Sequence, residues 1–376
     1  MKYREHIFDR LQRFDWIMAL SMFVLLAIGM AAVYSVDSAE GRALIYVPTQ
    51  LIALTIGLVF FFILGSVHMT FFEASAKIGY VIAGALLVLV LIFGENVRGT
   101  VGWFRFGGLS FQPAEFAKAA LVLYLAYMVS KQGRRFDRFH YIVRGGIPTF
   151  ILIGLIMLQP DFGSALVLGG IWFGILFFSG AKKRYLGAIG LFVIIVFITG
   201  WFFFFAEYQK DRLRTFINIE ADIQGAGYNV RQSIIAIGSG RLLGRGIGFG
   251  SQSQLHFLPE AQTDFIFAVI GEELGFIGVL TVFVLYALLL WRLITIAKMS
   301  PDDFSAYTIV GIACFFLIQI VFNIGGASGV LPVTGLTLPF LSYGGSSLVI
   351  NLALMGMAES IAASAKRHES ALTFLG

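Results

Sequence analysis

The chain has 376 residues, of which 58% are hydrophobic and only 13% charged, and its mean hydropathy is +0.85. These values exclude an ordinary soluble domain, which needs more charge to cover its surface. The net charge of +5 does not indicate nucleic-acid binding, because the basic residues are scattered between apolar stretches, and the single cysteine excludes an intrachain disulfide or a cysteine metal cluster.

Ten apolar stretches follow one another along the chain. Only helices and closed barrels satisfy the backbone in lipid, and runs of about 20 residues have helix length. We therefore expect an all-α polytopic integral membrane protein with about ten transmembrane helices. The expected spans are 16–36, 45–66, 77–93, 115–130, 146–158, 162–180, 186–206, 264–291, 305–325 and 347–363. The first has no cleavage pattern after it, so we interpret it as a helix and not a signal peptide.

The fifth expected span, 146–158, is the shortest and ends at Gln159-Pro160-Asp161. It could be a short crossing helix or a re-entrant one. If it does not cross, the two termini would lie on opposite sides of the membrane. The topology that follows depends on this span.

With ten spans, both termini lie on one side, and the segments on that side hold 17 of the 27 lysines and arginines. This excess predicts cytoplasmic N- and C-termini. It places a large extracytoplasmic loop, 207–263, between the seventh and eighth helices and makes 364–376 a cytoplasmic tail. The six basic residues of that loop do not change the assignment, because long loops cross regardless of charge. The whole chain, 1–376, is expected to form a single domain, with 16–363 as its membrane-embedded core.

Three segments on the expected outer side, 94–114, 207–263 and 326–346, are long and rich in glycine. Loops of this length are usually functional. Their glycines match neither a dinucleotide fingerprint nor a Walker A loop. No internal repeat of fixed period is visible, which disfavours a transporter built from inverted halves.

Charged residues inside spans are costly and are therefore functional candidates. Glu115 and Lys118 share one helix face, so they could equally form a local ion pair. Asp161 follows Pro160 at a helix start, where it could cap the helix or neutralise Lys118.

Asp264 ends the long outer loop, after LPEAQT, where a lipid headgroup and a water-soluble acceptor could both reach it. A carboxylate at a partly dehydrated interface has a raised pKa, which suits a general base. The alternative is a helix cap, a role that Thr263 could also fill. Glu272, two helical turns further on, is expected to support the site from below or to pair with a basic residue in the interior.

A pyrophosphate leaving group requires cations or N–H donors. The outer segments supply candidates for this role: Arg98, Arg105, Arg231, Arg241 and Arg245. Each could equally be a solvated loop charge.

Five motifs run in order along almost the whole chain. They are GLSFQPAEFAK at 108–118, QPDFGSALVL at 159–168, QSIIAIGSG at 232–240, FLPEAQTDFIFAVIGEELG at 257–275 and LPFLSYGGSSL at 338–348. Together they resemble the SEDS family (shape, elongation, division, sporulation). Ser342, in the last motif, is a further candidate for substrate binding.

The resemblance implies a peptidoglycan glycosyltransferase of the RodA or FtsW type, which polymerises lipid II on the outer face of the bacterial cytoplasmic (inner) membrane. It implies a class B penicillin-binding protein as partner, lipid II and polyprenyl-pyrophosphate-linked glycan as substrates, and contact with membrane lipids. The family's loop aspartate falls on Asp264, and its intramembrane Glu and Lys fall on Glu115 and Lys118. No cofactor is certain, although a divalent cation, Mg²⁺ or Mn²⁺, could help to hold the pyrophosphate.

Two positions depart from the family pattern. Gln262 stands where histidine is common, and Gly102 stands where many members have arginine before the tryptophan. The second departure leaves Arg98 or Arg105 as substitutes for the missing cation.

The resemblance and a single base together imply an inverting transfer with release of polyprenyl pyrophosphate, because one displacement converts an α-linked donor into a β-linked product. Two other functions remain open: a flippase or transporter of lipid-linked precursors, and a non-catalytic scaffold for a penicillin-binding protein. The string QSQLHFLPEAQTDFIF is closer to the RodA branch, which favours a role in cell elongation and shape over one in division.

Overall fold

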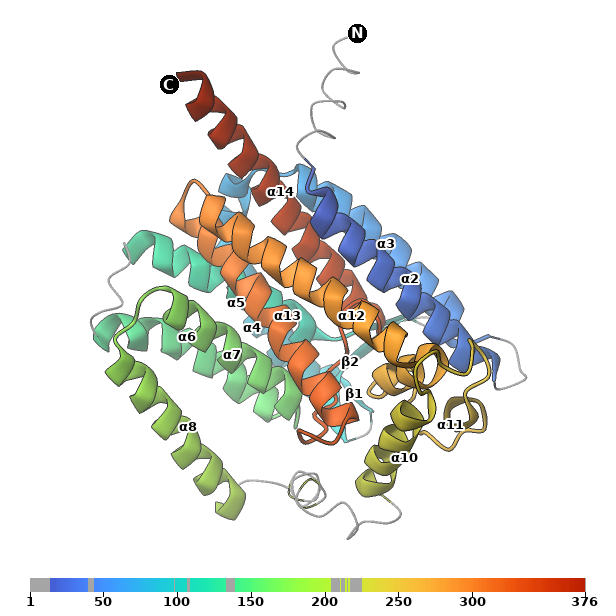
Figure 1. The fold of residues 1–376 in the computed structure, drawn as a ribbon. Helices are drawn as coiled ribbons and strands as arrows, with labels where there is room; N and C mark the ends of the chain where they lie inside the picture. The colour runs from blue at the N-terminus through green and yellow to red at the C-terminus, as the bar shows by residue number, and fades with distance from the viewer. Residues whose placement is uncertain are drawn as a thin grey trace.

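The computed structural model describes residues 14–39, 44–97, 99–106, 109–132, 139–203, 210, 214, 216 and 225–375. A helix lies over each of the ten predicted spans (Figure 1). These helices are α2 (Trp16–Ser38), α3 (Tyr46–Ser66), α4 (Met69–Phe93), α5 (Pro113–Gln132), α6 (Phe139–Met157), α7 (Phe162–Phe178), α8 (Lys183–Phe203), α12 (Ile266–Met299), α13 (Asp303–Ala327) and α14 (Gly345–Leu375). The chain is thus a mostly helical, multi-pass membrane protein.

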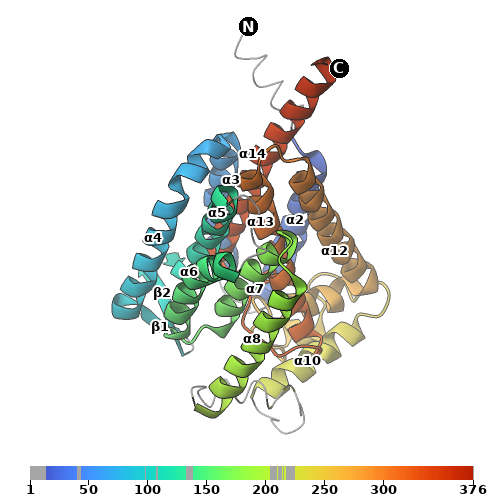
Figure 2. The ribbon, with the colours of Figure 1, turned by 90° about the vertical axis from the view of Figure 1, so that its left-hand side faces the viewer.

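Seven helices in the described residues are long and apolar enough to cross a membrane: α2, α3, α4, α8, α12, α13 and α14. The apolar part of α6, Ile142–Met157, and α7 are shorter. A complete crossing by α5, α6 and α7, and with it the count of ten, stays a prediction. Helix α8 lies at the periphery of the bundle, beside α7 (Figure 2).

The start of α2 and the end of α14 meet at one end of the bundle, away from the small sheet and α10 (Figure 1). The N–H of Asp15 donates to Glu359 Oε1 at 2.7 Å, and Lys366 Nζ donates to the carbonyl of Phe14 at 2.9 Å. Arg292 of α12 binds the Asp15 carboxylate at 2.7 Å. The start of α2 and the C-terminal half of α14 are therefore held together at one end of the bundle.

The expected all-α fold needs one correction, in segment 94–114. There the chain forms a three-stranded antiparallel sheet of β1 (Glu95–Val97), β2 (Thr100–Phe106) and β3 (Leu109–Phe111). Strand β2 is rich in β-branched and aromatic residues, which fit a pleated surface. The described part of the predicted loop 207–263 likewise includes helices α10 (Ala226–Ser239) and α11 (Ser251–Gln254).

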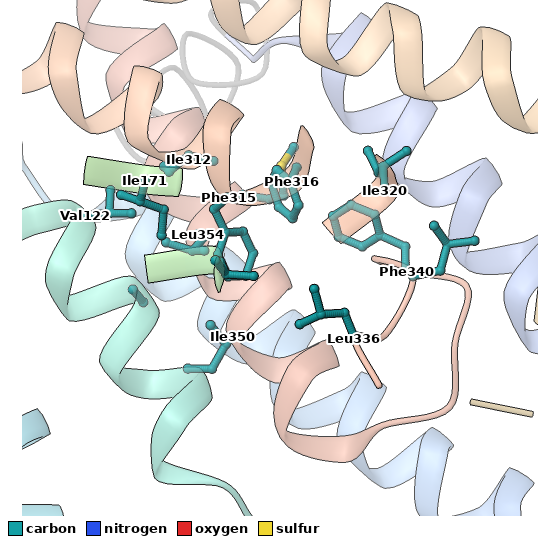
Figure 3. Close-up of a cluster of buried hydrophobic side chains, with 14 of the residues drawn as sticks. Val122, Ile171, Ile312, Phe315, Phe316, Ile320, Leu336, Phe340, Ile350 and Leu354 are labelled. Atoms are coloured by element: carbon teal, nitrogen blue, oxygen red, sulfur yellow. The ribbon is translucent and has the colours of Figure 1, made fainter. Parts of the chain in front are cut away.

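The bundle packs around α13. Figure 3 shows Phe315 and Phe316 of this helix among side chains of α5, α7, α14 and the segment before α14. Both phenylalanines are fully buried, and the ring of Phe316 lies 5.3 Å from that of Phe340. The segment that carries Phe340 is therefore part of the hydrophobic core.

This segment, 328–344, connects α13 to α14 and enters the bundle. Leu341 is fully buried, and the hydroxyl of Tyr286 in α12 donates to the carbonyl of Pro339. A Cβ on Gly29 of α2 would lie 2.5 Å from the Phe340 carbonyl oxygen. Non-helical backbone at this depth is tolerated only where protein covers it. The sequence analysis predicted that 326–346 is an outer segment, but it did not predict that residues such as Phe340 and Leu341 are buried in the bundle.

Helix α12 is broken at Gly275, whose φ of 64° and ψ of −161° are not helical. The break frees backbone groups, and the loop after α10 binds them. The N–H groups of Arg245 and Gly246 donate to the carbonyls of Glu272 and Glu273, and the N–H of Phe276 donates to the carbonyl of Arg241. The short half-helix that starts at Ile266 is thus joined to the loop after α10 by hydrogen bonds in both directions.

Replacing Gly275 with alanine should destabilise the protein by about 2–3 kcal/mol, because this backbone conformation is essentially restricted to glycine. An added Cβ would also lie 2.2 Å from the Gly244 nitrogen. Gly84→Ala in α4 is the matched control, because nothing lies within 4 Å of its added Cβ. Thermal unfolding in detergent should show a lower Tm for Gly275→Ala alone; equal Tm values would contradict the strained break.

Candidate functional site

Asp264 lies two residues before α12 begins and is partly exposed. The cap position of α12 is Phe265, whose side chain makes no capping hydrogen bond. Thr263 does not cap the helix either, because its hydroxyl donates to the carboxylate of Glu260 at 3.1 Å. The suggestion that Thr263 caps α12 was therefore wrong.

The turn before Asp264 is built on Glu260, which has a φ of 57°. Its carbonyl accepts hydrogen bonds from the N–H groups of Thr263 at 3.1 Å and Phe265 at 3.3 Å. This fixes the peptide groups on both sides of Asp264. The Asp264 carboxylate therefore projects from a defined turn at the N-terminal end of the half-helix.

Glu115 and Lys118 form a buried ion pair within α5. Lys118 Nζ lies 2.6 Å from Glu115 Oε1, and their side chains are 0% and 6% exposed. The ammonium group also lies 5.8 Å from the ring centroid of Phe315. The local ion-pair interpretation of these two residues is confirmed.

Asp161 caps α7. Its Oδ1 accepts from the N–H of Ser164 at 2.9 Å, and its Oδ2 accepts from the side-chain amide of Gln112 at 3.2 Å. Gln112 immediately precedes α5, so Asp161 joins the starts of two helices. The cap interpretation is confirmed, and the ion pair of Lys118 is with Glu115 instead.

Glu272 is fully buried beneath the segment between α10 and α12, and it caps α11. Its carboxylate accepts from the N–H of Gln252 at 2.9 Å, the N–H of Ser253 at 3.2 Å and the hydroxyl of Ser251 at 3.3 Å. Arg245 Nη1 lies 2.9 Å from the same hydroxyl. Glu272 thus holds the loop that carries Arg245, as a supporting residue would.

Of the candidate arginines, Arg98 lies outside the described residues. Arg105 is exposed on β2, 3.5 Å from Glu95 of β1. Arg231 is exposed on α10. Arg241 and Arg245 are also exposed, and they border an open hollow of about 510 Å³ lined by residues 239–245. The structure therefore brings two of the five together, directly beside the break in α12.

Ser342 is buried, and its hydroxyl is engaged with backbone. It donates to the carbonyl of Thr263 at 2.7 Å and accepts from the N–H of Leu338 at 2.9 Å. Next to it, burial and the Asp37 carboxylate raise the pKa of the Tyr343 phenol above its usual range, against a hydrogen bond with Thr49 that lowers it. This geometry favours a structural role for Ser342 over substrate binding.

The sequence reasoning missed Asn323 of α13. Its side-chain amide donates to the carbonyl of Asp264 at 3.2 Å and to that of Leu336 at 2.8 Å. A carboxamide inside an apolar span was a usable signal, because polar groups in lipid need partners. The partners themselves, distant in sequence, could not be identified from spacing.

Among the residues that the structure describes, no group of three or more His, Cys, Asp or Glu side chains could hold a metal ion. A role for Mg²⁺ or Mn²⁺ therefore stays a prediction.

Comparison with known proteins identifies the family. The family model FTSW_RODA_SPOVE, described as cell cycle protein, matches residues 12–367. The probable peptidoglycan glycosyltransferase FtsW of Trichlorobacter lovleyi is 36% identical, over 95% of each chain. Stage V sporulation protein E of Bacillus subtilis is 37% identical over 91% of this chain and 95% of the relative. Peptidoglycan glycosyltransferase MrdB of Escherichia coli is 35% identical, over 90% and 92%.

Solved structures agree. A chain from a peptidoglycan synthase complex, in which polymerisation and crosslinking are coordinated, has a TM-score of 0.78 and 32% identity, covering 94% of this chain and 98% of that one. The rod shape determining protein RodA of Thermus thermophilus has a TM-score of 0.70 and 31% identity, covering 93% and 96%. With a family model over nearly its whole length and relatives above 30% identity, the chain belongs to the FtsW/RodA/SpoVE family, the SEDS proteins.

Proposed function

We propose that the chain is a peptidoglycan glycosyltransferase that polymerises lipid II on the outer face of the bacterial cytoplasmic membrane. The observation that carries the proposal is the position of Asp264, a partly exposed carboxylate on a fixed turn at the outer-loop end of a broken membrane helix. The names of the relatives support the reaction, since FtsW and MrdB are both named peptidoglycan glycosyltransferases.

In the proposed reaction, the 4-hydroxyl of an incoming lipid II sugar gives its proton to the Asp264 carboxylate. The hydroxyl oxygen bonds to the anomeric carbon of the growing chain as the bond to polyprenyl pyrophosphate breaks. One displacement converts an α-linked donor into a β-linked product. A retaining route needs a second carboxylate as nucleophile about 5–5.5 Å away. Glu260 is the nearby candidate in the loop for this nucleophile. Its carboxylate already accepts a hydrogen bond from the Thr263 hydroxyl, which disfavours the retaining route.

The leaving pyrophosphate would be held by Arg241 and Arg245, which border the hollow next to the α12 break. Arginine binds phosphate oxygens in two parallel hydrogen bonds and keeps its charge. Arg245 is already oriented by Ser251, which Glu272 holds from below. This arrangement supports stabilisation of charge on the leaving group.

We further propose a class B penicillin-binding protein as partner and a role in cell elongation. The synthase complex that contains a similar chain supports the partner. A flippase would be expected to place its ionisable groups around a substrate site near the midplane of the bilayer. Glu115 and Lys118 are instead buried and paired with each other, which favours the enzyme.

The test is polymerisation of lipid II by the purified chain together with its penicillin-binding partner, with the transpeptidase blocked by a penicillin. Glycan strands resolved by length on a gel are the expected result. The partner alone is the control. No polymer from a folded complex would contradict the proposed enzyme and favour the flippase or scaffold.

The proposed topology predicts which residues a membrane-impermeant maleimide labels in intact cells. In a Cys314→Ala background, which removes the single cysteine, Leu243→Cys should be labelled from outside because Leu243 is 74% exposed. Lys183→Cys, also at an exposed position, should be labelled only after permeabilisation. The reverse pattern would contradict an outer-face site.

A further inference from the structure

Three consecutive carbonyl groups around Asp264 accept hydrogen bonds from a distant part of the chain. The carbonyl of Gln262 accepts from the N–H of Tyr343 at 2.8 Å, and that of Thr263 from the hydroxyl of Ser342 at 2.7 Å. The carbonyl of Asp264 accepts from the amide of Asn323 at 3.2 Å. These three contacts, which we call the carbonyl clamp, join the turn to α13 and to the buried segment 328–344.

The N–H groups of the same turn are also hydrogen-bonded. The N–H groups of Thr263 and Phe265 both donate to the Glu260 carbonyl. The peptide groups around Asp264 are therefore held from two sides. Rotation of the Asp264 backbone would break contacts on both.

The two donor side chains of the clamp are themselves fixed. Ser342 is 5% exposed and accepts from the N–H of Leu338, and Asn323 is 4% exposed and also donates to the carbonyl of Leu336. The side chain of Gln50 in α3 brackets Ser342, donating to its carbonyl at 3.3 Å and accepting from the Gly344 N–H at 3.1 Å. The clamp is thus anchored in the rigid interior of the bundle.

Stability alone does not explain this choice of residues. Burying a polar side chain costs free energy unless it is hydrogen-bonded, and the net gain from one such bond is only about 0.5–1.5 kcal/mol. Two buried polar side chains here bind the carbonyls of Thr263 and Asp264. A general base, in contrast, needs its position held closely, because a displacement of about 1 Å can cost about 100-fold in rate.

We propose that Asn323 and Ser342 are positioning residues, which set the location of the Asp264 carboxylate through the carbonyl clamp. The proposal rests on the proposed function of Asp264 as the base. Neither residue is required to touch the substrate. Their removal should therefore slow the reaction step without weakening substrate binding.

The experiment compares Ser342→Ala and Asn323→Ala with Ser360→Ala in the purified complex. Ser360 is a matched control, because it is 6% exposed and its hydroxyl donates to the carbonyl of Val67, the residue that follows α3. We expect the glycan synthesis rate at saturating lipid II to fall about 10–100-fold in the two clamp variants, with KM within about threefold of wild type. Ser360→Ala should keep the wild-type rate.

Ser342→Thr retains the hydroxyl and should recover activity relative to Ser342→Ala. A Tm change no larger than that of Ser360→Ala, with a reduced rate, would support positioning. Wild-type rates in both clamp variants, a rise in KM that accounts for the loss, or a Tm loss well beyond that of the control would overturn the proposal. Asp264→Asn, assayed alongside, distinguishes failure of the proposed base from failure of the proposed clamp. Full activity of Asp264→Asn would refute the role of Asp264 as the base. An inactive Asp264→Asn together with fully active clamp variants would refute only the positioning role of Asn323 and Ser342.

Discussion

Asp264→Asn should leave the protein folded and bound to its penicillin-binding partner but reduce glycan synthesis about 10²–10⁴-fold. The change preserves the size and most of the hydrogen-bonding capacity of the side chain and removes the basic carboxylate. Loss of general base catalysis typically has this magnitude. A lost helix cap would cost only about 1 kcal/mol of stability. Equal amounts of purified wild-type and variant complexes, assayed for polymer, measure the difference.

Asp302→Asn provides the matched control for this substitution. Asp302 caps α13 by accepting from the N–H and hydroxyl of Ser305, and asparagine caps helices equally well. This variant should therefore keep its activity. Asp264→Glu should recover little, because the added methylene moves the base by about 1 Å or more. Polymer from Asp264→Asn within a few-fold of wild type would show that Asp264 is not the base.

The parts of the fold that were predicted from sequence depend on local or compositional signals. Apolar runs located the helices because the lipid imposes their length. Glu115 and Lys118 were recognised as a pair because three residues along a helix bring side chains together, and the structure has them 2.6 Å apart. Asp161 was predicted as a cap from its place after a proline, and it caps α7.

The parts that were missed depend on contacts between distant segments. The break in α12 needs the loop at 241–246 to bind its freed backbone groups, and the glycine at 275 alone does not identify that partner. Ser342 was predicted only as a candidate for substrate binding, and its hydrogen bond with the carbonyl of Thr263, 79 residues earlier, was not predicted. The sheet at 95–111 was hidden because its short strands lie in a glycine-rich segment. Spacing in the sequence carries no information on such pairings.

Lys118→Met should be among the most destabilising single substitutions in the chain. It removes the partner of Glu115, whose side chain is 6% exposed, and so leaves a carboxylate uncompensated in a low-dielectric interior. Breaking a buried pair from one side typically costs about 3–5 kcal/mol. Methionine has nearly the volume of lysine, so the loss of stability in Lys118→Met does not come from a cavity. Lys118→Ala would add the cost of a cavity to the cost of the broken pair. Membrane abundance and Tm in detergent should both fall.

The double change Lys118→Met with Glu115→Gln separates the loss of the pair from the loss of the charge. Replacing both members of a buried pair with neutral residues is often nearly neutral, so abundance and Tm should recover relative to the single variant. Lys131→Met is the exposed control: Lys131 pairs with Glu73 at 2.9 Å, but its side chain is 60% exposed, so abundance and Tm should stay close to those of the wild type. If the single and double variants lost the same stability, the charge that Lys118 neutralises would have to be one other than Glu115, with Asp161 as the first candidate. Because Asp161 already accepts from Gln112 and Ser164, we expect recovery in the double variant instead.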